Sequence, residues 1–276
     1  MFAGADAMTT RLAIAGLGAI GLKVARSIDA GTVQGITLTA VAARDVDKAR
    51  ANIAGLRAPP RIAALDELPA LADVIVECIP AAQFRAVAEP VLKAGRTLMP
   101  LSVGALLDNF DLVELARSTG GRIIVPSGAI LGLDAIRAVA EGQVSSVRIV
   151  TRKPPAGLEG APLLQQRGQS LAGLTAPLLL FSGSAREAAR GFPANLNVSV
   201  AVALAGIGPD RTHIEVWADP AVSRNTHTVL VKSDSSDLTM TIENIPSLEN
   251  PRTGTITALS VIAALRRLSE SLVVGT

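Results

Sequence analysis

The sequence has little aromatic and cysteine content. It lacks tyrosine, its aromatic residues amount to 2%, and it has one cysteine and two histidines. One thiol cannot form an internal disulfide. Because Cys and His are so few, we also expect no metal site. Few aromatic side chains are therefore present on which the bases of a nucleic acid could stack. With 26 basic and 24 acidic residues giving a net charge of +2, a nucleic-acid partner is not indicated.

Long apolar runs are also missing, although 49% of the residues are hydrophobic. The apolar residues occur in short segments broken by Gly, Pro or charge, and none approaches the ~18 residues that a membrane span needs. The first ten residues, MFAGADAMTT, have neither the basic nor the apolar region of a secretory signal. We therefore expect no membrane partner and a cytoplasmic location.

The first half of the 276 residues alternates short apolar runs with segments of helical period, which is typical of a parallel sheet covered by helices. The pattern predicts strands at 11–15, 36–43, 73–79, 97–102 and 122–126. Helices are predicted between them at 19–30, 45–54, 83–94 and 106–119. The expected fold class is α/β, with a Rossmann-type, doubly wound parallel sheet.

The second half predicts a second α+β domain with a mostly antiparallel sheet. A helix at 133–141 and a strand at 144–152 precede a surface loop through Gln169, and a capping box of Ser184 and Glu187 starts a helix that ends at Gly191. A helix at 196–205, strands at 213–218, 226–232 and 238–243, and an amphipathic helix at 255–268 follow. We expect the last helix to return to the first domain, so that residues 9–126 with 251–276 form the dinucleotide-binding domain and 127–250 the second domain.

A glycine-rich turn supplies the strongest local signal. Gly16, Gly18 and Gly21 form G-x-G-x-x-G directly after a predicted strand, and Ala19 and Ile20 open the helix. The first glycine permits the tight turn, the second lets a pyrophosphate approach the backbone, and the third lets helix and strand pack closely. The free N–H groups of the helix N-terminus then face the phosphate charge. The sequence therefore predicts NAD or NADP binding by this turn.

The end of the second strand bears on cofactor preference. Arg44 stands where NAD-specific enzymes usually place a carboxylate for the ribose, and Asp45 follows it. A guanidinium there attracts a 2′-phosphate, and Asp45 can still reach the hydroxyls, so we expect NADP to be accepted alongside NAD. The alternative is that Arg44 is a solvated loop residue.

Two further strand ends fall at the carboxyl edge of the same sheet, where open α/β sheets bind ligands. Ile79 and Pro80 follow the third predicted strand, and Ser102 ends the fourth. We expect these residues to contact the cofactor, although ordinary loop chemistry would produce the same residues. Cys78 has no basic neighbour in sequence, so we interpret it as a small buried filler and not as a nucleophile.

The alternation of side chains along a strand gives the two histidines different surroundings. His213 shares a face with Glu215, whereas His227 points the same way as Val229 and Val231, toward the interior. His227 is therefore the candidate for acid–base chemistry. A histidine on an apolar face is more often a hydrogen-bonded core residue, and this alternative stays open at this point.

The chain resembles the L-aspartate dehydrogenase family. The resemblance lies in G-x-G-x-x-G and in the segments VECIP (76–80), SVGAL (102–106), VPSGAI (125–130) with GLD (132–134), FPANLNV (192–198), ADP (218–220) with NTH (225–227), and ENIPS (243–247) with ENP (249–251). It implies a catalytic role for His227 and cofactor contacts at Ala129 and Asn197. It also implies that residues 127–250 bind substrate and form a homodimer.

The resemblance implies NAD(P)-dependent oxidative deamination of L-aspartate, a reaction associated with NAD biosynthesis. Ser127, Asn197 and Asn225 are the expected polar contacts of the substrate. For the substrate carboxylates, the candidates are Arg152, Lys153, Arg224 and Arg252. Two alternatives remain, namely another two-domain dehydrogenase of a small hydroxy or semialdehyde acid, and a non-catalytic NAD(P)-sensing protein.

Overall fold

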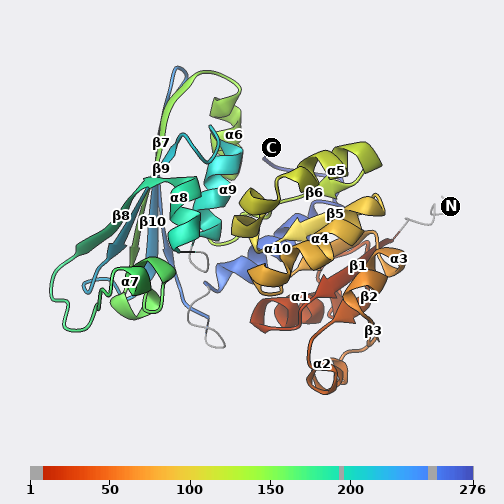
Figure 1. Ribbon diagram of the computed structural model, residues 1–276. Coiled ribbons are helices and arrows are strands. Elements are labelled where there is room, and N and C mark those ends of the chain that lie inside the picture. The colour runs from red at the N-terminus through yellow and green to blue at the C-terminus, as the bar shows by residue number, and fades with distance from the viewer. Residues whose placement is uncertain (1–8, 193–195, 248–253, 276) are drawn as a thin grey trace. The chain divides into compact units, whose positions relative to one another are not determined.

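The computed structural model describes residues 9–192, 196–247 and 254–275. The chain divides into two compact units (Figure 1). The first consists of the described parts of Met1–Pro126 together with Ala258–Val273, and the second of the described parts of Ser127–Thr257 and Val274–Thr276.

The first unit is built on a six-stranded parallel sheet in the order β3-β2-β1-β4-β5-β6. Its strands are β1 (Thr10–Ala15), β2 (Ile36–Ala42), β3 (Arg61–Ile62), β4 (Val74–Glu77), β5 (Thr97–Pro100) and β6 (Arg122–Ile123). This is the strand order of the Rossmann fold, and it confirms the predicted fold class. The sequence did not predict β3, because a two-residue edge strand is too short to show a period.

Helices cover both faces of this sheet, as a doubly wound fold requires (Figure 1). They are α1 (Ala19–Asp29), α2 (Val46–Ile53), α3 (Leu68–Leu71), α4 (Phe84–Lys93), α5 (Asp111–Thr119) and α10 (Ile256–Arg266). Val261 and Leu265 of α10 are fully buried in one core cluster with Leu12 and Ile14 of β1. The C-terminal helix thus packs on the first sheet, as predicted. The helix expected at 106–119 is shorter, because Val103–Asn109 forms a 3₁₀ turn.

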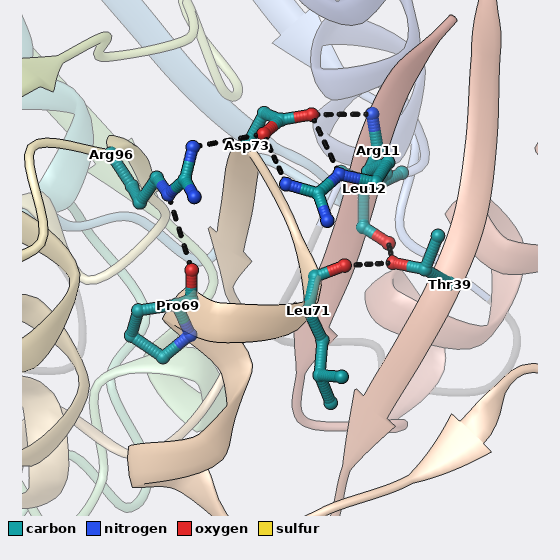
Figure 2. A network of polar contacts seen from close by, with 7 residues as sticks. All are labelled: Arg11, Leu12, Thr39, Pro69, Leu71, Asp73 and Arg96. Carbon is teal, nitrogen blue, oxygen red and sulfur yellow. Dashed lines mark hydrogen bonds and ion pairs between the residues drawn. The ribbon is translucent and has the colours of Figure 1, made fainter.

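A polar network holds the amino ends of the central strands together (Figure 2). The Asp73 carboxylate accepts hydrogen bonds from Arg11 Nη2 at 2.7 Å and from Arg96 Nη1 at 3.0 Å. The hydrogen bond from Arg11 is the main reason that the pKa of Asp73 is lowered. Thr39 Oγ1 donates toward the carbonyl oxygens of Leu12 and Leu71. The network lies at the edge opposite the carboxyl ends, so we assign it to stability and not to ligand binding.

The second unit contains a five-stranded sheet in the order β11-β10-β7-β9-β8. Its strands are β7 (Val144–Lys153), β8 (Leu178–Ser184), β9 (Thr212–Ala218), β10 (Asn225–Ser233) and β11 (Asp237–Asn244). Only the β7–β9 pair is parallel, so the prediction of a mostly antiparallel sheet is confirmed. The sequence did not predict β8, because its apolar run leads directly into the next helix without a turn signal.

One face of this sheet is covered by helices (Figure 1). They are α6 (Leu133–Ala140), α8 (Ala185–Gly191) and α9 (Asn197–Ala205), while α7 (Pro162–Gln166) contacts α8. The stretch through Gln169, which was expected to be a loop, therefore contains the short helix α7. Its apolar residues are only Leu163 and Leu164, too few to show a helical period. The predicted capping box is confirmed, since Ser184 N donates to Glu187 Oε2 at 2.9 Å and Glu187 N to Ser184 Oγ at 3.2 Å.

Candidate active site

The glycine turn connects β1 to α1 and packs against the carboxyl end of β4. Gly16 has φ = 101°, and a Cβ there would lie 2.6 Å from the carbonyl oxygen of Cys78. A Cβ on Gly21 would lie 2.0 Å from the carbonyl oxygen of Gly16, so both positions require glycine for the fold itself. A Cβ on Gly18 would meet no described atom within 4 Å. The open space beside the backbone at Gly18 therefore fits a cofactor phosphate.

The amino end of α1 has the properties that an anion site needs. Gly18 is its N-cap residue, and in the described part of the chain no side chain caps the helix. The first N–H groups of an α-helix have no partner within the helix, and the helix dipole favours negative charge at that end. Ala19 and Ile20, the first residues of α1, thus present backbone donors at the position expected for the pyrophosphate.

Arg44 and Asp45 differ in how they are held. Asp45 is the N-cap residue of α2, and its Oδ1 accepts a hydrogen bond from Lys48 N at 2.9 Å. Arg44 is exposed just after β2. Because the cap occupies one oxygen of Asp45, the exposed guanidinium is the more available of the two groups for a cofactor ribose.

A buried carboxylate connects the ends of β4 and β5. Glu77 is fully buried, and it accepts hydrogen bonds from Ile79 N at 2.9 Å and from Ser102 N at 2.9 Å. Burial raises the pKa of Glu77, while the hydrogen bonds from Ser102 and Ile79 act in the opposite direction. Glu77 therefore fixes the backbone at two of the residues expected to contact the cofactor. Sequence reasoning missed it, although a carboxylate inside the apolar run DVIVECIP was a usable signal.

The remaining expected residues of this edge are Pro80 and Cys78. Pro80 is exposed, and Cys78 is half-buried directly after β4. Burial raises the pKa of the Cys78 thiol well above its usual range, and the neighbouring charge of Glu77 adds to the effect. A thiol with a raised pKa is a poor nucleophile, as expected for Cys78. The side chain is half-buried, and not fully buried as predicted.

In the second unit several candidate residues lie at one edge of the sheet. The carboxyl ends of β7, β9 and β11 lie there with the amino end of β10. His227, at the start of β10, is only 3% exposed and pairs in register with Thr151 of β7. Its Nδ1 lies 3.0 Å from Thr151 Oγ1. The predicted parity is confirmed, because His213 is exposed and contacts Ser182 instead.

A buried lysine accompanies this histidine. Lys153 stands two residues beyond Thr151 on β7, hence on the same face, and is 4% exposed. Burial lowers the pKa of Lys153 to about 8. The pKa of His227 is lowered to about 3, first by burial and then by the charge of Lys153, so the imidazole is neutral at pH 7. When Nδ1–H donates to the Thr151 hydroxyl, Nε2 keeps its lone pair for a proton.

The four cationic candidates for the substrate carboxylates are placed very differently. Arg152 points to the other face, where its Nη1 lies 2.9 Å from Asp219 Oδ2 and its guanidinium lies 4.9 Å from the Trp217 ring centroid. Arg224 is exposed, and Arg252 lies outside the described residues. Lys153 is the candidate that shares the face of His227.

Two asparagines stand at the same edge. Asn225, an expected substrate contact, is half-buried and pairs in register with Asn244 at the end of β11. Asn244 is 4% exposed, and its Nδ2 donates to the carbonyl oxygen of Ala129 at 3.0 Å. It thereby connects the segment of Ser127 and Ala129, both half-buried, to the sheet. Sequence reasoning did not single out Asn244, because a strand-end asparagine shows no pattern.

The last expected contact, Asn197, is half-buried and is the first residue of α9. In the described ranges, no group of three or more His, Cys, Asp or Glu side chains could hold a metal ion. Nor does any helix described there combine the length and apolar character that crossing a bilayer requires.

The strand order, the glycine turn and the second α+β unit define a two-domain dehydrogenase that uses NAD or NADP. The family "Homoserine dehydrogenase, NAD binding domain" matches residues 16–126, and "Aspartate dehydrogenase, C-terminal" matches residues 134–268. The chain belongs to the L-aspartate dehydrogenase family. It is therefore an oxidoreductase of the amino-acid dehydrogenase class.

Relatives support this assignment over nearly the whole chain. An L-aspartate dehydrogenase of Bradyrhizobium diazoefficiens is 56% identical over 266 residues, covering 96% of this chain and 94% of the relative. The L-aspartate dehydrogenase 3 of Bordetella bronchiseptica is 57% identical over 265 residues, with 96% and 97% covered. The crystal structure of aspartate dehydrogenase from Thermotoga maritima has a TM-score of 0.72 at 25% identity, covering 96% of this chain and 99% of that one.

Proposed function

We propose that this protein catalyses the NAD(P)-dependent oxidative deamination of L-aspartate to iminosuccinate, which water converts to oxaloacetate and ammonia, and also the reverse amination. The observation that carries the proposal is the buried, neutral His227 beside Thr151 at a sheet edge. Two relatives that share more than half of their residues with this chain are named for the same reaction.

His227 is the proposed acid–base group. Oxidation at Cα requires the amine to lose a proton as the hydride leaves, and a positioned imidazole can accept it. The contact with Thr151 fixes the ring orientation, since it engages Nδ1 and leaves Nε2 for the substrate. Because the imidazole is neutral when no ligand is bound, its lone pair is available without prior deprotonation.

The first unit supplies the proposed cofactor site. Gly16, Gly18 and Gly21 shape the turn, and the N–H groups at Ala19 and Ile20 receive the pyrophosphate. When bound, the nicotinamide supplies the hydride acceptor. Ile79, Pro80 and Ser102 form the proposed wall beside it, with Glu77 fixing the backbone at Ile79 and Ser102.

The other proposed contacts come from the second unit. Ser127, Asn197 and Asn225 offer hydrogen bonds to the substrate, and Ala129 together with Asn197 offers contacts to the cofactor. Asn244 supports this proposal for Ala129, because it holds the Ala129 carbonyl group in place. All of these side chains or backbone groups are neutral, so they can orient a ligand without adding charge.

The decisive experiment is a substitution of His227 by Ala. Without the general acid–base group, we expect the turnover rate to fall about 10²-fold or more, with cofactor affinity unchanged. NAD(P)H absorbance with oxaloacetate plus ammonia measures the rate. His213→Ala is the matched control, because that histidine is exposed on the same sheet. Near-normal turnover in His227→Ala would remove this residue from the mechanism.

The same assay separates the alternatives. A dehydrogenase of a hydroxy or semialdehyde acid turns over its substrate when ammonia is omitted, whereas amination consumes ammonia. A non-catalytic NAD(P)-sensing protein binds cofactor without turning over any keto acid. Either result would replace the proposed reaction.

We also propose that the second unit forms a homodimer, as the family resemblance implies. The outer face of its sheet carries the half-buried Trp217 and Leu230 and, on β8, Leu179, which is 41% exposed. Leu179 and Trp217 are neighbours across β8 and β9, while Leu230 lies apart from them beside Arg148. Exposed apolar side chains on a sheet face favour association. Sedimentation of the wild type and of Leu230→Asp tests this, and a monomeric wild type would refute it. A cytoplasmic location and a role in NAD biosynthesis remain predictions from the sequence.

A further inference from the structure

Glu77 places a carboxyl group inside the first unit. The residue ends β4, and its side chain is fully buried. Its Oε1 accepts hydrogen bonds from Ile79 N at 2.9 Å and Ser102 Oγ at 3.1 Å, and its Oε2 accepts from Ser102 N at 2.9 Å and Leu101 N at 3.2 Å. All of these donors are neutral, and among the described residues no cation forms an ion pair with Glu77. The hydrogen bonds therefore satisfy the two oxygens without cancelling their charge.

The contacts of this group favour its ionised form. Burial raises the pKa of Glu77, whereas the hydrogen bonds from Ser102, Ile79 and Leu101 oppose that rise. A backbone N–H can only donate, so each of these groups favours the charged form of its acceptor. Protonation would weaken the bonds, because a neutral carboxyl group is the poorer acceptor. The group is therefore expected to be a carboxylate at pH 8.

The charge adjoins the proposed cofactor wall, since Ile79 and Ser102 donate to it directly. The glycine turn is also close, because a Cβ on Gly16 would lie 2.6 Å from the carbonyl oxygen of Cys78, the residue after Glu77. A dinucleotide spans both halves of a Rossmann sheet, and the end of β2 serves the ribose of the adenosine half. The nicotinamide half therefore falls to β4 and β5, whose ends Glu77 joins.

We propose that Glu77 is a specificity-determining residue for the redox form of the cofactor, and that its buried charge favours NADP⁺ over NADPH. This inference rests on the proposed function, because it uses the cofactor wall at Ile79 and Ser102. The oxidised nicotinamide ring carries a positive charge, and the reduced ring carries none. A charge in a low-dielectric interior acts over a longer range than a charge in water, so Glu77 attracts the oxidised ring without contacting it. Its repulsion of the phosphates is common to both forms and cancels in the ratio of their affinities.

The same preference affects the direction of the reaction on the enzyme. A site that favours the oxidised ring stabilises the bound state in which the hydride has already left NADPH. A difference in affinity between two states shifts the equilibrium between them by the same factor. The equilibrium between the bound states therefore moves toward amination, although the equilibrium in solution is unchanged.

The test measures the two affinities without any substrate. NADPH binding is followed by its fluorescence, and NADP⁺ binding by displacement of NADPH, both at pH 8. Glu77→Gln keeps the shape of the side chain and removes its charge. We expect the ratio of the NADP⁺ dissociation constant to that of NADPH to rise about 10-fold in this variant. The melting temperature verifies folding. If Glu77→Gln does not fold, Glu77→Thr, which is neutral and suits a strand, takes its place.

Glu77→Asp is the matched control for a purely structural effect. It keeps the charge but shortens the side chain, so it disturbs the hydrogen bonds to Ile79 and Ser102. We expect it to weaken the binding of both forms equally, with the ratio as in the wild type. Asp66→Asn removes an exposed carboxylate from the same unit, and it leaves both affinities unchanged because solvent screens that charge.

The outcomes separate this inference from the proposed function. An unchanged ratio in the neutral variant would overturn the inference. An equal rise in Glu77→Asp would also overturn it, because the disturbed hydrogen bonds would then explain both variants. If the ratio rises as expected but no aspartate is turned over, the proposed function fails and the inference stands. If aspartate is turned over and the ratio stays constant, only the inference fails.

Discussion

Thr151 Oγ1 lies 3.0 Å from Nδ1 of His227, and both side chains are buried on the same face of the second sheet. The two residues are 76 positions apart in the sequence, and the antiparallel register of β7 and β10 brings them opposite each other. A buried imidazole nitrogen needs a hydrogen-bond partner, so Thr151 both satisfies the ring and fixes its orientation.

Thr151→Val tests this relationship. Valine has nearly the same shape as threonine but no hydroxyl. In the variant, Nδ1 of His227 therefore has lost its Thr151 partner, and the imidazole is no longer held in one tautomer. The loss of one buried hydrogen bond corresponds to about 1–2 kcal/mol, or roughly 10-fold in kcat. The NAD(P)H assay measures this, with cofactor affinity expected to be unchanged. Thr228→Val is the control, because Thr228 contacts Thr241 on the other face. Equal activities of the two variants would contradict the assignment.

The pKa of His227 predicts how stability depends on pH. Since the pKa is about 6.5 in the unfolded chain and about 3 in the folded one, the unfolded state binds the proton more readily, and stability falls as the pH drops below 6.5. Relative to His227→Gln, the wild type should lose about 2 kcal/mol between pH 7.5 and pH 5. Urea unfolding monitored by fluorescence measures this, because the single tryptophan, Trp217, lies in the same sheet. Parallel pH curves for the two proteins would show that His227 titrates normally.

Two glycines of the turn should respond differently to alanine. Gly18 has φ = −74°, and a Cβ there meets no described atom within 4 Å, so Gly18→Ala should fold normally. We expect its affinity for NADPH to fall at least about 10-fold, because the added methyl occupies the phosphate approach. Gly21→Ala should instead lose about 2 kcal/mol or more of stability, since its Cβ would lie 2.0 Å from the Gly16 carbonyl oxygen. Calorimetry and NADPH fluorescence titration measure both effects, and wild-type NADPH affinity in Gly18→Ala would disprove the phosphate position.

Arg44→Asp should change the preference between the two cofactors. The exposed guanidinium just after β2 attracts a 2′-phosphate, whereas a carboxylate repels it and accepts hydrogen bonds from the ribose hydroxyls of NAD. We expect the ratio of kcat/KM for NADP to that for NAD to fall by about 10-fold or more. The substitution removes one attractive contact between an exposed charge and the 2′-phosphate and replaces it with a repulsive one. Arg50→Asp is the control, because Arg50 is an exposed arginine on the helix α2 that follows Arg44. An unchanged ratio in Arg44→Asp would assign Arg44 to the solvated surface.

The fold was predictable where local patterns repeat. The βα units of the first half, the glycine turn and the capping box at Ser184 depend on spacing within a few residues, so the sequence alone indicated them. β3 and β8 were missed for a common reason. A two-residue edge strand and an apolar run without a turn signal are fixed by the strands beside them, and that information lies elsewhere in the chain.

The amino-acid sequence by itself determined the Rossmann-type fold class, the dinucleotide turn, the inward parity of His227 and the family. Each of these follows from a period or a motif that is contiguous along the chain. Only the tertiary structure decided which polar groups surround His227 and that Glu77 joins two strand ends. It also separated Lys153 from Arg152, neighbours in sequence that point to opposite faces. The physical reason is that burial and hydrogen-bond partners depend on strand register, which brings together residues far apart in the sequence.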